Sequence, residues 1–109
     1  MNTQIKYYKD SRGNSPFLDW LENLADTMGR AKIKVHIDRL ARGNFGNCRS
    51  LGNGLHKLKI NFGPGYRVYF GLMGQEIVLI LCRGSKQGQN RDIEKAKEYW
   101  ASLKEEKIL

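Results

Sequence analysis

The feature that most constrains how this chain folds is the alternation of side chains along residues 55–72, LHKLKINFGPGYRVYFGL. Successive side chains of a β-strand point to opposite faces. The first half, 55–62, carries on one face His56, Leu58, Ile60 and Phe62, and on the other Leu55, Lys57, Lys59 and Asn61. The second half, 66–72, carries on one face Tyr66, Val68, Phe70 and Leu72, and on the other Arg67, Tyr69 and Gly71. The pattern predicts a hairpin with one apolar and one cationic face.

The turn of this hairpin is predicted at Gly63-Pro64-Gly65, since a two-residue loop would set Ile60 opposite the charge of Arg67. A three-residue loop pairs Ile60 with Val68 and Lys59 with Tyr69, and its last glycine supplies the left-handed residue that such loops need. We therefore expect four side chains to share one face, away from the core: Lys57, Lys59, Arg67 and Tyr69.

The remaining elements follow from periodicity and caps. Residues 4–8 alternate like a short strand, and Ser15-Pro16 predicts the start of a helix that runs to about residue 26. A second helix is predicted over 28–42, strands over 55–62, 66–72 and 76–82, and a last helix from about residue 92. The order β-α-α-β-β-β-α predicts a single α+β domain over 1–109. In it an antiparallel-dominated sheet packs against two N-terminal helices, and the C-terminal helix follows.

Positive charge is concentrated in the middle of the chain. The formal net charge is +8, and residues 30–86 carry eleven Lys and Arg against two Asp and Glu. This asymmetry predicts a polyanionic partner, RNA or DNA first, although a solvated basic face is the alternative. No segment is apolar enough for a membrane span or a signal peptide, so we expect a cytoplasmic protein. Two cysteines and two histidines form no zinc pattern, so we expect no metal and no cofactor.

Two lysines on one strand face, without a carboxylate in either strand, suggest chemistry. Lys57 and Lys59 would lie about 6.8 Å apart along the strand, and their repulsion favours the neutral form of one amine. Such an amine can act as a general base, while the other cations hold phosphate oxygens. The alternative is an exposed sheet face with the lysines that commonly protect strands from aggregation.

Two segments, LGNGLHKLKINFGPGYRVYFG and IVLILCRGSKQGQNRDIEKA, resemble the RelE/ParE toxin superfamily. The resemblance extends over nearly the whole chain and is greatest to the HigB-like branch, which includes addiction-module killer proteins and phage Gp49-like proteins. It implies a RelE-like fold and the toxin of a type II toxin–antitoxin pair. It also implies an endoribonuclease that cuts mRNA on the ribosome without metal, by attack of the 2′-hydroxyl on the scissile phosphate.

The same resemblance assigns roles by position. Lys57 and Lys59 match the paired-lysine strand, Arg67 matches the arginine that holds the phosphate, and Lys86 matches the basic residue after the last strand. The implied partners are mRNA, the ribosome and a cognate antitoxin, expected to be a helix-turn-helix protein from the adjacent gene. We also expect RNA contacts from five further residues: Tyr69, His56, Arg83, Gln89 and Arg91.

The chain departs from its relatives in two respects. It reads Lys57-Leu58-Lys59 where many HigB-like relatives read Glu-Leu-Arg, which favours nuclease activity. Its last segment, QGQNRDI, has no tyrosine or histidine to stack on a base or move a proton, as some mRNA-cutting relatives do. Two alternatives therefore stay open, a ParE-like inhibitor of DNA gyrase and an inactive remnant that only binds RNA or an antitoxin. The sequence leaves undetermined which lysine is the base, whether and where mRNA is cut, the oligomeric state and the identity of the antitoxin.

Overall fold

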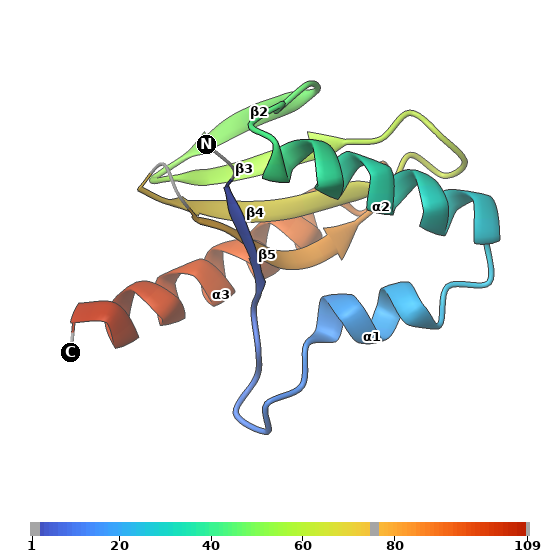
Figure 1. The fold of residues 1–109 in the computed structure, drawn as a ribbon. Coiled ribbons are helices and arrows are strands. Elements are labelled where there is room, and N and C mark those ends of the chain that lie inside the picture. Colours follow the sequence, from blue (N-terminus) through green and yellow to red (C-terminus); the bar gives the residue numbers. More distant parts are fainter. Residues whose placement is uncertain (1–2, 75–76, 109) are drawn as a thin grey trace.

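A computed structural model describes residues 3–74 and 77–108, with side chains up to residue 103 in the last helix. Eight elements follow one another along these residues (Figure 1): β1 (Gln4–Tyr7), α1 (Pro16–Glu22), α2 (Thr27–Ala41), β2 (Cys48–Gly52), β3 (Leu55–Lys59), β4 (Arg67–Met73), β5 (Ile77–Gly84) and α3 (Gln89–Ile108). The α+β class with a single mixed sheet is confirmed. None of the helices in the described ranges is both long and apolar enough to cross a membrane.

The strands form one sheet in the order β1-β5-β4-β3-β2. β1 lies parallel to β5, and every other neighbouring pair is antiparallel. β5 is almost continuously apolar, and it lies between two neighbouring strands with both faces buried. Its expected start at residue 76 lies outside the described residues.

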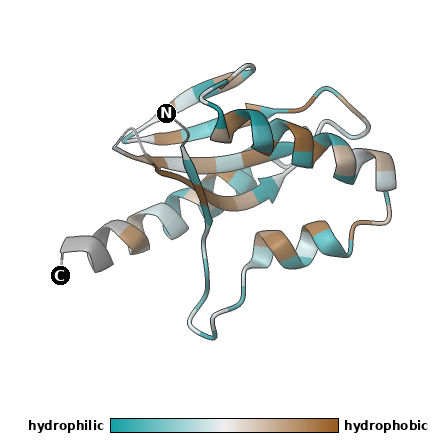
Figure 2. Cartoon of the chain, in the orientation of Figure 1, coloured by the Kyte–Doolittle hydropathy of each residue, from teal (hydrophilic) through white to brown (hydrophobic). Residues whose placement is uncertain are grey.

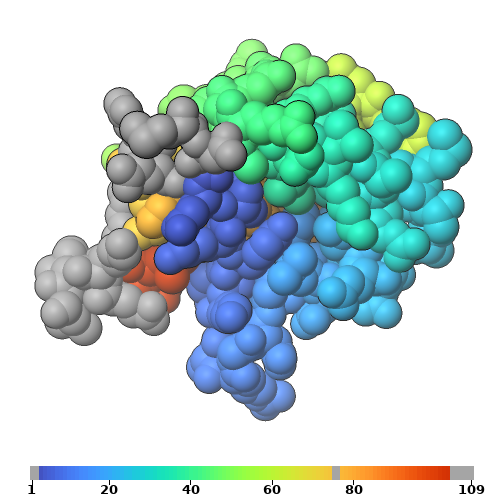
Figure 3. All heavy atoms as spheres, viewed as in Figure 1, coloured from blue at the N-terminus to red at the C-terminus, as the bar shows by residue number. Residues whose placement is uncertain are grey.

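The sheet is covered on both faces, so the molecule has two layers of core. The two N-terminal helices cover one face, and α3 crosses the other (Figure 1). The first layer contains Phe17, Ile33, Leu58, Val68 and Phe70, and the second contains Leu55, Tyr69, Leu81, Ala96 and Trp100. Much of β5 is brown in the hydropathy view (Figure 2), as expected of a strand packed on both sides. β1 and the first two helices hide most of the sheet in the space-filling view (Figure 3).

The predicted cap of the first helix, Ser15, is confirmed, and Asp26 caps the second helix. The Ser15 hydroxyl accepts the Leu18 N–H, and the Asp26 carboxylate accepts the Gly29 N–H. α1 ends at Glu22, before the expected residue 26, because Asn23 terminates it and Asp26 already caps α2. α3 begins at Gln89 rather than near residue 92.

The predicted hairpin register is wrong by two residues. β3 pairs Leu58 with Val68 and Lys59 with Arg67, and the Ile60 N–H donates to the Tyr66 carbonyl at 2.9 Å. The connection is therefore 61–65 rather than three residues, and the predicted strand 55–62 ends early. Phe62 lies in this loop and packs against the first core layer instead of extending the strand. A shift of two leaves every side chain on its predicted face.

A fifth strand, β2, was missed. Gly52 pairs with Leu55 around a two-residue turn, in which Asn53 and Gly54 have φ of 55° and 83°. Positive φ at both central residues is typical of a type I′ hairpin turn, for which Asn-Gly is the favoured pair. The strand itself, CRSLG, shows little alternation because it is an edge strand with most of its side chains exposed.

The cationic face is not turned away from the core, which corrects a second expectation. α3 packs over it, so Tyr69 is fully buried in the second layer, and Arg67, beside the 61–65 loop, retains 3% exposure. Only the end of this face at the 61–65 loop and the first turn of α3 stays open, and the cations surround that opening.

Candidate active site

Neighbouring strands bring the predicted lysines and arginine together. In the β3–β4 pair, Lys59 lies opposite Arg67 and Lys57 lies opposite Tyr69. On the other side of β3, Arg49 of β2 lies opposite Lys57. Side chains directly opposite each other in an antiparallel pair are close enough to interact. Five residues are called the cation cluster below: Arg49, Lys57, Lys59, Arg67 and Lys86.

Arg67 is the most buried of these cations. Its Nη1 donates to the Gly65 carbonyl at 2.6 Å, while its Nε is buried and has no hydrogen-bond partner among the described residues. Burying a charged group without full hydrogen bonding is unfavourable. An anion that accepted hydrogen bonds from this guanidinium would relieve that cost, since arginine suits phosphate oxygens.

Gly65 makes the close approach possible. Its φ is +76°, and a Cβ at this position would lie 3.1 Å from Nη1 of Arg67 and 3.2 Å from Cβ of Lys86. The backbone of the 61–65 loop thus passes directly beside the guanidinium. The predicted left-handed glycine is confirmed, although in a longer loop than expected.

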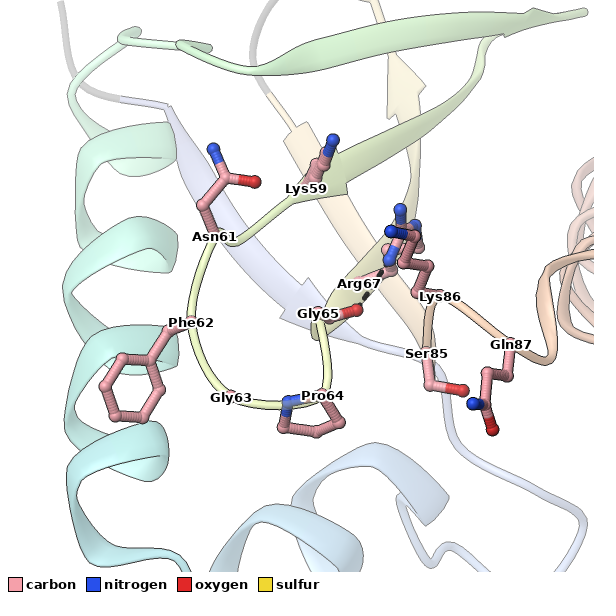
Figure 4. Close-up of a pocket in the computed structure, with 10 residues that line it drawn as sticks. All are labelled: Lys59, Asn61, Phe62, Gly63, Pro64, Gly65, Arg67, Ser85, Lys86 and Gln87. Atoms are coloured by element: carbon pink, nitrogen blue, oxygen red, sulfur yellow. Dashed lines mark hydrogen bonds between the residues drawn. The ribbon is translucent and has the colours of Figure 1, made fainter.

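Arg67, Lys59 and Asn61 each line two neighbouring cavities. The loop cavity, of about 550 Å³, lies between the 61–65 loop and the 85–87 segment (Figure 4). The strand cavity, of about 490 Å³, lies over β2 and β3 and includes Arg49, Lys57 and Gln89. Among the described residues that line the two, none is Asp or Glu. The pair of cavities is thus a positively charged depression suited to a polyanion.

Lys57 is held differently from Lys59. Its Nζ donates to Oε1 of Gln89 at 2.9 Å, and its side chain is half-buried, whereas Lys59 is exposed. Burial lowers the pKa of the Lys57 amine, and the charges of Arg67, Arg49 and Lys59 lower the pKa further. A lysine with a lowered pKa takes part in proton transfer more readily near neutral pH.

The segment that carries Lys86 is fixed by hydrogen bonds at the start of α3. The Ser85 N–H donates to the Asp92 carboxylate at 3.1 Å, and the Gly88 N–H donates to the Ser85 hydroxyl at 3.3 Å. The Gln89 amide donates to the Lys86 carbonyl at 3.2 Å. These bonds hold the Lys86 backbone beside Arg67, while the Lys86 side chain is exposed at the loop cavity (Figure 4).

Four residues expected to contact RNA lie outside the cation cluster. Tyr69 is fully buried beneath α3, and burial raises its pKa to about 12. His56 lies on the opposite sheet face, stacked on Phe70 with ring centroids 5.4 Å apart. Arg83 and Arg91 line a separate cavity of about 500 Å³ between α1 and α3. Gln89, in contrast, joins the cluster through Lys57.

Sequence reasoning missed Arg49, because it missed the strand that carries this residue. The Asn53-Gly54 pair was the available signal, since it would have paired 48–52 with 55–59 and set Arg49 beside Lys57. The described residues contain no group of three or more His, Cys, Asp or Glu side chains that could hold a metal ion. The cluster presents amines and guanidinium groups, which donate hydrogen bonds to anions.

Two comparisons with known proteins bear on this arrangement. The fold matches a solved structure of the E. coli toxin RelE, a double arginine-to-alanine mutant in the free state. The TM-score is 0.63 and the identity 18%, over 90% of this chain and 98% of that one. The chain is therefore a RelE-fold protein, as the sequence resemblance predicted, with a cation cluster beside its β3–β4 hairpin.

In sequence, the chain is 42% identical over 81 residues to an uncharacterized protein of Haemophilus influenzae (strain Rd). The aligned residues cover 74% of this chain and 82% of that protein. The chain belongs to the same family as that protein. No family model matches the sequence.

Proposed function

We propose that this protein is the toxin of a type II toxin–antitoxin pair and an endoribonuclease that cuts mRNA on the ribosome, in the cytoplasm. The observation that carries the proposal is the buried Arg67 guanidinium between two cavities lined by further cations and without carboxylates. An RNA phosphate matches this environment in charge and in hydrogen-bonding character.

The cluster has a group for each step of cleavage by the substrate's own 2′-hydroxyl. Lys57, as the neutral amine, accepts the 2′-hydroxyl proton, and the 2′-oxygen bonds to the adjacent phosphorus. Arg67 and Lys59 hold the negative charge that develops on the phosphate oxygens. The bond from phosphorus to the 5′-oxygen breaks, and Lys86 gives that oxygen a proton. The products are a 2′,3′-cyclic phosphate and a 5′-hydroxyl.

This assignment gives the base role to Lys57 rather than Lys59. The lowered pKa of the Lys57 amine supports it, because the neutral form is more populated near neutral pH. Lys59 is exposed and lines both cavities, a position suited to a charge contact with phosphate. His56 and Tyr69 have no place in this scheme, because they lie on the other face and inside the core.

The test is expression in bacteria without an antitoxin, wild type beside Lys57→Ala, Lys59→Ala, Arg67→Ala and the triple variant. The wild type is expected to stop growth and to leave ribosome-bound transcripts cut with 5′-hydroxyl ends, and the triple variant to do neither. A wild type that allows growth, or a triple variant that is equally toxic, refutes the proposal.

Two other outcomes identify the alternatives. DNA damage signalling with intact transcripts indicates a gyrase inhibitor on the same fold. Salt-sensitive RNA binding without cleavage indicates a protein that holds RNA only. We further propose that a helix-turn-helix antitoxin covers the cation cluster. Co-expression of a neighbouring open reading frame of that type is expected to restore growth. Its protein product is expected to co-purify with this chain.

A further inference from the structure

Gln89 connects two parts of the candidate site, the strand β3 and the segment that follows β5. Its Oε1 accepts a hydrogen bond from Nζ of Lys57 on β3, at 2.9 Å, and its Nε2 donates to the carbonyl of Lys86 in the preceding loop, at 3.2 Å. One side chain therefore links Lys57, the proposed base, to the segment that carries Lys86, the proposed proton donor.

The chemistry of the two partners fixes the orientation of the amide. An ammonium group can only donate hydrogen bonds and a backbone carbonyl can only accept them, so the amide oxygen must face Lys57 and the amide nitrogen must face Lys86. A side chain with an acceptor and a donor at one end is required, which excludes Leu, Lys and Arg at this position. Asn has these groups but is shorter by one methylene.

The acceptor from Gln89 is the one neutral oxygen that the described residues place on the Lys57 amine by a hydrogen bond. The groups that face this amine from the packed elements are cationic: Arg49 from β2, Lys59 from β3 and Arg67 from β4. No described carboxylate lines the cavity they share. The Gln89 amide oxygen attracts the Lys57 ammonium group, whereas three positive charges repel it. The balance affects both the position of Lys57 and its pKa.

We propose that Gln89 is a positioning residue that holds Lys57 in the strand cavity against the surrounding cations and couples it to the Lys86 segment. The consequence for cleavage rests on the proposed function, but the contact itself does not. Without the amide, Lys57 is free to swing into solvent, because like charges lie on three sides of it and its side chain is flexible.

The contact is tested by the titration of Lys57 in the protein labelled with ¹³C at the lysine ε-carbon, followed by NMR, with no RNA present. Gln89→Leu removes the acceptor that favours the charged amine, so Lys57 is expected to titrate at lower pH than in wild type. Gln89→Glu supplies a carboxylate, so Lys57 is expected to titrate at higher pH. The Lys59 signal is expected to move less than the Lys57 signal in both variants.

The matched controls are Asn90→Leu and Asn90→Asp, at the neighbouring exposed position in the first turn of α3. They make the same changes in polarity and charge without touching Lys57. A Lys57 titration that is the same in wild type and both Gln89 variants, or that moves equally in the Asn90 variants, overturns the proposal whatever the protein does to RNA.

The kinetic consequence is measured by single-turnover cleavage of mRNA on programmed ribosomes as a function of pH. Gln89→Leu is expected to lower the maximal rate roughly tenfold or more, since small misplacements of a catalytic group have large effects, and to change binding less than about threefold. In Gln89→Glu, the limb of the profile along which the rate rises with pH is expected to move to higher pH. An inactive wild type refutes the proposed function, while the titration still decides the role of Gln89. A loss confined to binding contradicts a positioning role.

Discussion

At the scale of single residues, Arg67 shows a conflict between stability and function. It is a buried cation beside other cations, and the described residues give its Nε no hydrogen-bond partner. Replacing a buried charge by an apolar group of similar size is often neutral or stabilising. Retaining arginine here therefore suggests a ligand that completes its hydrogen bonds, which is the ordinary situation of a site whose residues are selected for activity.

Arg67→Met tests this conflict. We expect the free energy of unfolding to rise by about 1 kcal/mol, because the unsatisfied charge is removed while the stem of the side chain is kept. Cleavage on programmed ribosomes is expected to fall by at least about 100-fold, because a preorganised charge at the phosphate is lost. Urea unfolding followed by circular dichroism measures the first effect. A loss of more than about 2 kcal/mol would instead assign Arg67 a structural role in holding the 61–65 loop through Gly65.

The hydrogen-bonded pair of Asp26 and Tyr66 predicts how the free energy of unfolding depends on pH. The Tyr66 hydroxyl donates to the Asp26 carboxylate at 2.8 Å, which joins the cap of α2 to the start of β4 next to Arg67. The hydrogen bond from the Gly29 N–H lowers the pKa of Asp26, and the bond from Tyr66 lowers it further. Burial raises the pKa of Tyr66, and Asp26 adds to that rise.

The direction of each pKa shift determines how the free energy of unfolding changes with pH. A carboxyl group with a lowered folded pKa stabilises the protein above its unfolded pKa near 4, and this contribution is lost as the pH falls. A tyrosine with a raised folded pKa stabilises below its unfolded pKa near 10, and this contribution is lost as the pH rises. Tyr66→Phe is expected to remove Tyr66's share of the alkaline limb and part of Asp26's share of the acid limb. Asp26→Asn is expected to remove all of Asp26's share of the acid limb. Unfolding across pH measures this, and unchanged limbs in both variants would disprove it.

At the scale of elements, Trp100 makes the closest approach of α3 to β4 within the second core layer. Trp100 lies against the Cα of Gly71 in β4, so closely that a Cβ there would overlap its ring, and its Nε1 donates to the Asn53 carbonyl at 2.7 Å. Because α3 also carries Gln89 and continues from the Lys86 segment, this contact determines how the helix lies over the candidate site.

Gly71→Ala is therefore expected to lower the free energy of unfolding by about 2 kcal/mol, the ordinary cost of overpacking. In a Trp100→Leu background the same substitution should cost markedly less, because the overlapping ring is gone. A double-mutant cycle by urea unfolding gives the coupling, with exposed Ser102→Ala on α3 as the reference for changes unrelated to this contact. Equal costs of Gly71→Ala in both backgrounds would show that the ring is not the cause.

The same scale shows what the sequence could predict. The alternation of 55–72 predicted the face of each strand side chain correctly. The error in register did not affect this prediction, because a shift of two residues leaves every side chain on the same face. The register itself depended on Phe62, whose apolar character suits a strand and a packed loop equally. The burial of Tyr69 could not be read from its own strand, because it depends on where α3, far along the chain, crosses the sheet. The burial of Arg67 depends on the path of the 61–65 loop beside it.

At the scale of the whole molecule, charge and burial are distributed separately. The apolar side chains close both faces of the sheet, and the positive charge of 30–86 remains at two places, the outer side of α2 and the cation cluster, except for Arg83 in the cavity between α1 and α3. Sequence analysis found the excess but could not assign it, because a basic helix face and a basic pocket look alike in composition. Only the folded chain separates charge that surrounds a cavity from charge in open solvent.

This separation predicts which charges determine the salt dependence of RNA binding. A lysine that contacts a phosphate contributes about 0.7 to the slope of log K against log salt for a single strand. Lys59→Gln is expected to lower the slope by about that amount, whereas Lys34→Gln, an equal change in net charge on the exposed side of α2, should leave it nearly unchanged. The measurement is fluorescence anisotropy of a short 2′-O-methylated RNA, which cannot be cut because its nucleophile is blocked, at salt concentrations from about 50 to about 200 mM. If both variants lower the slope equally, RNA is attracted by overall charge, and the cation cluster is not where the strand binds.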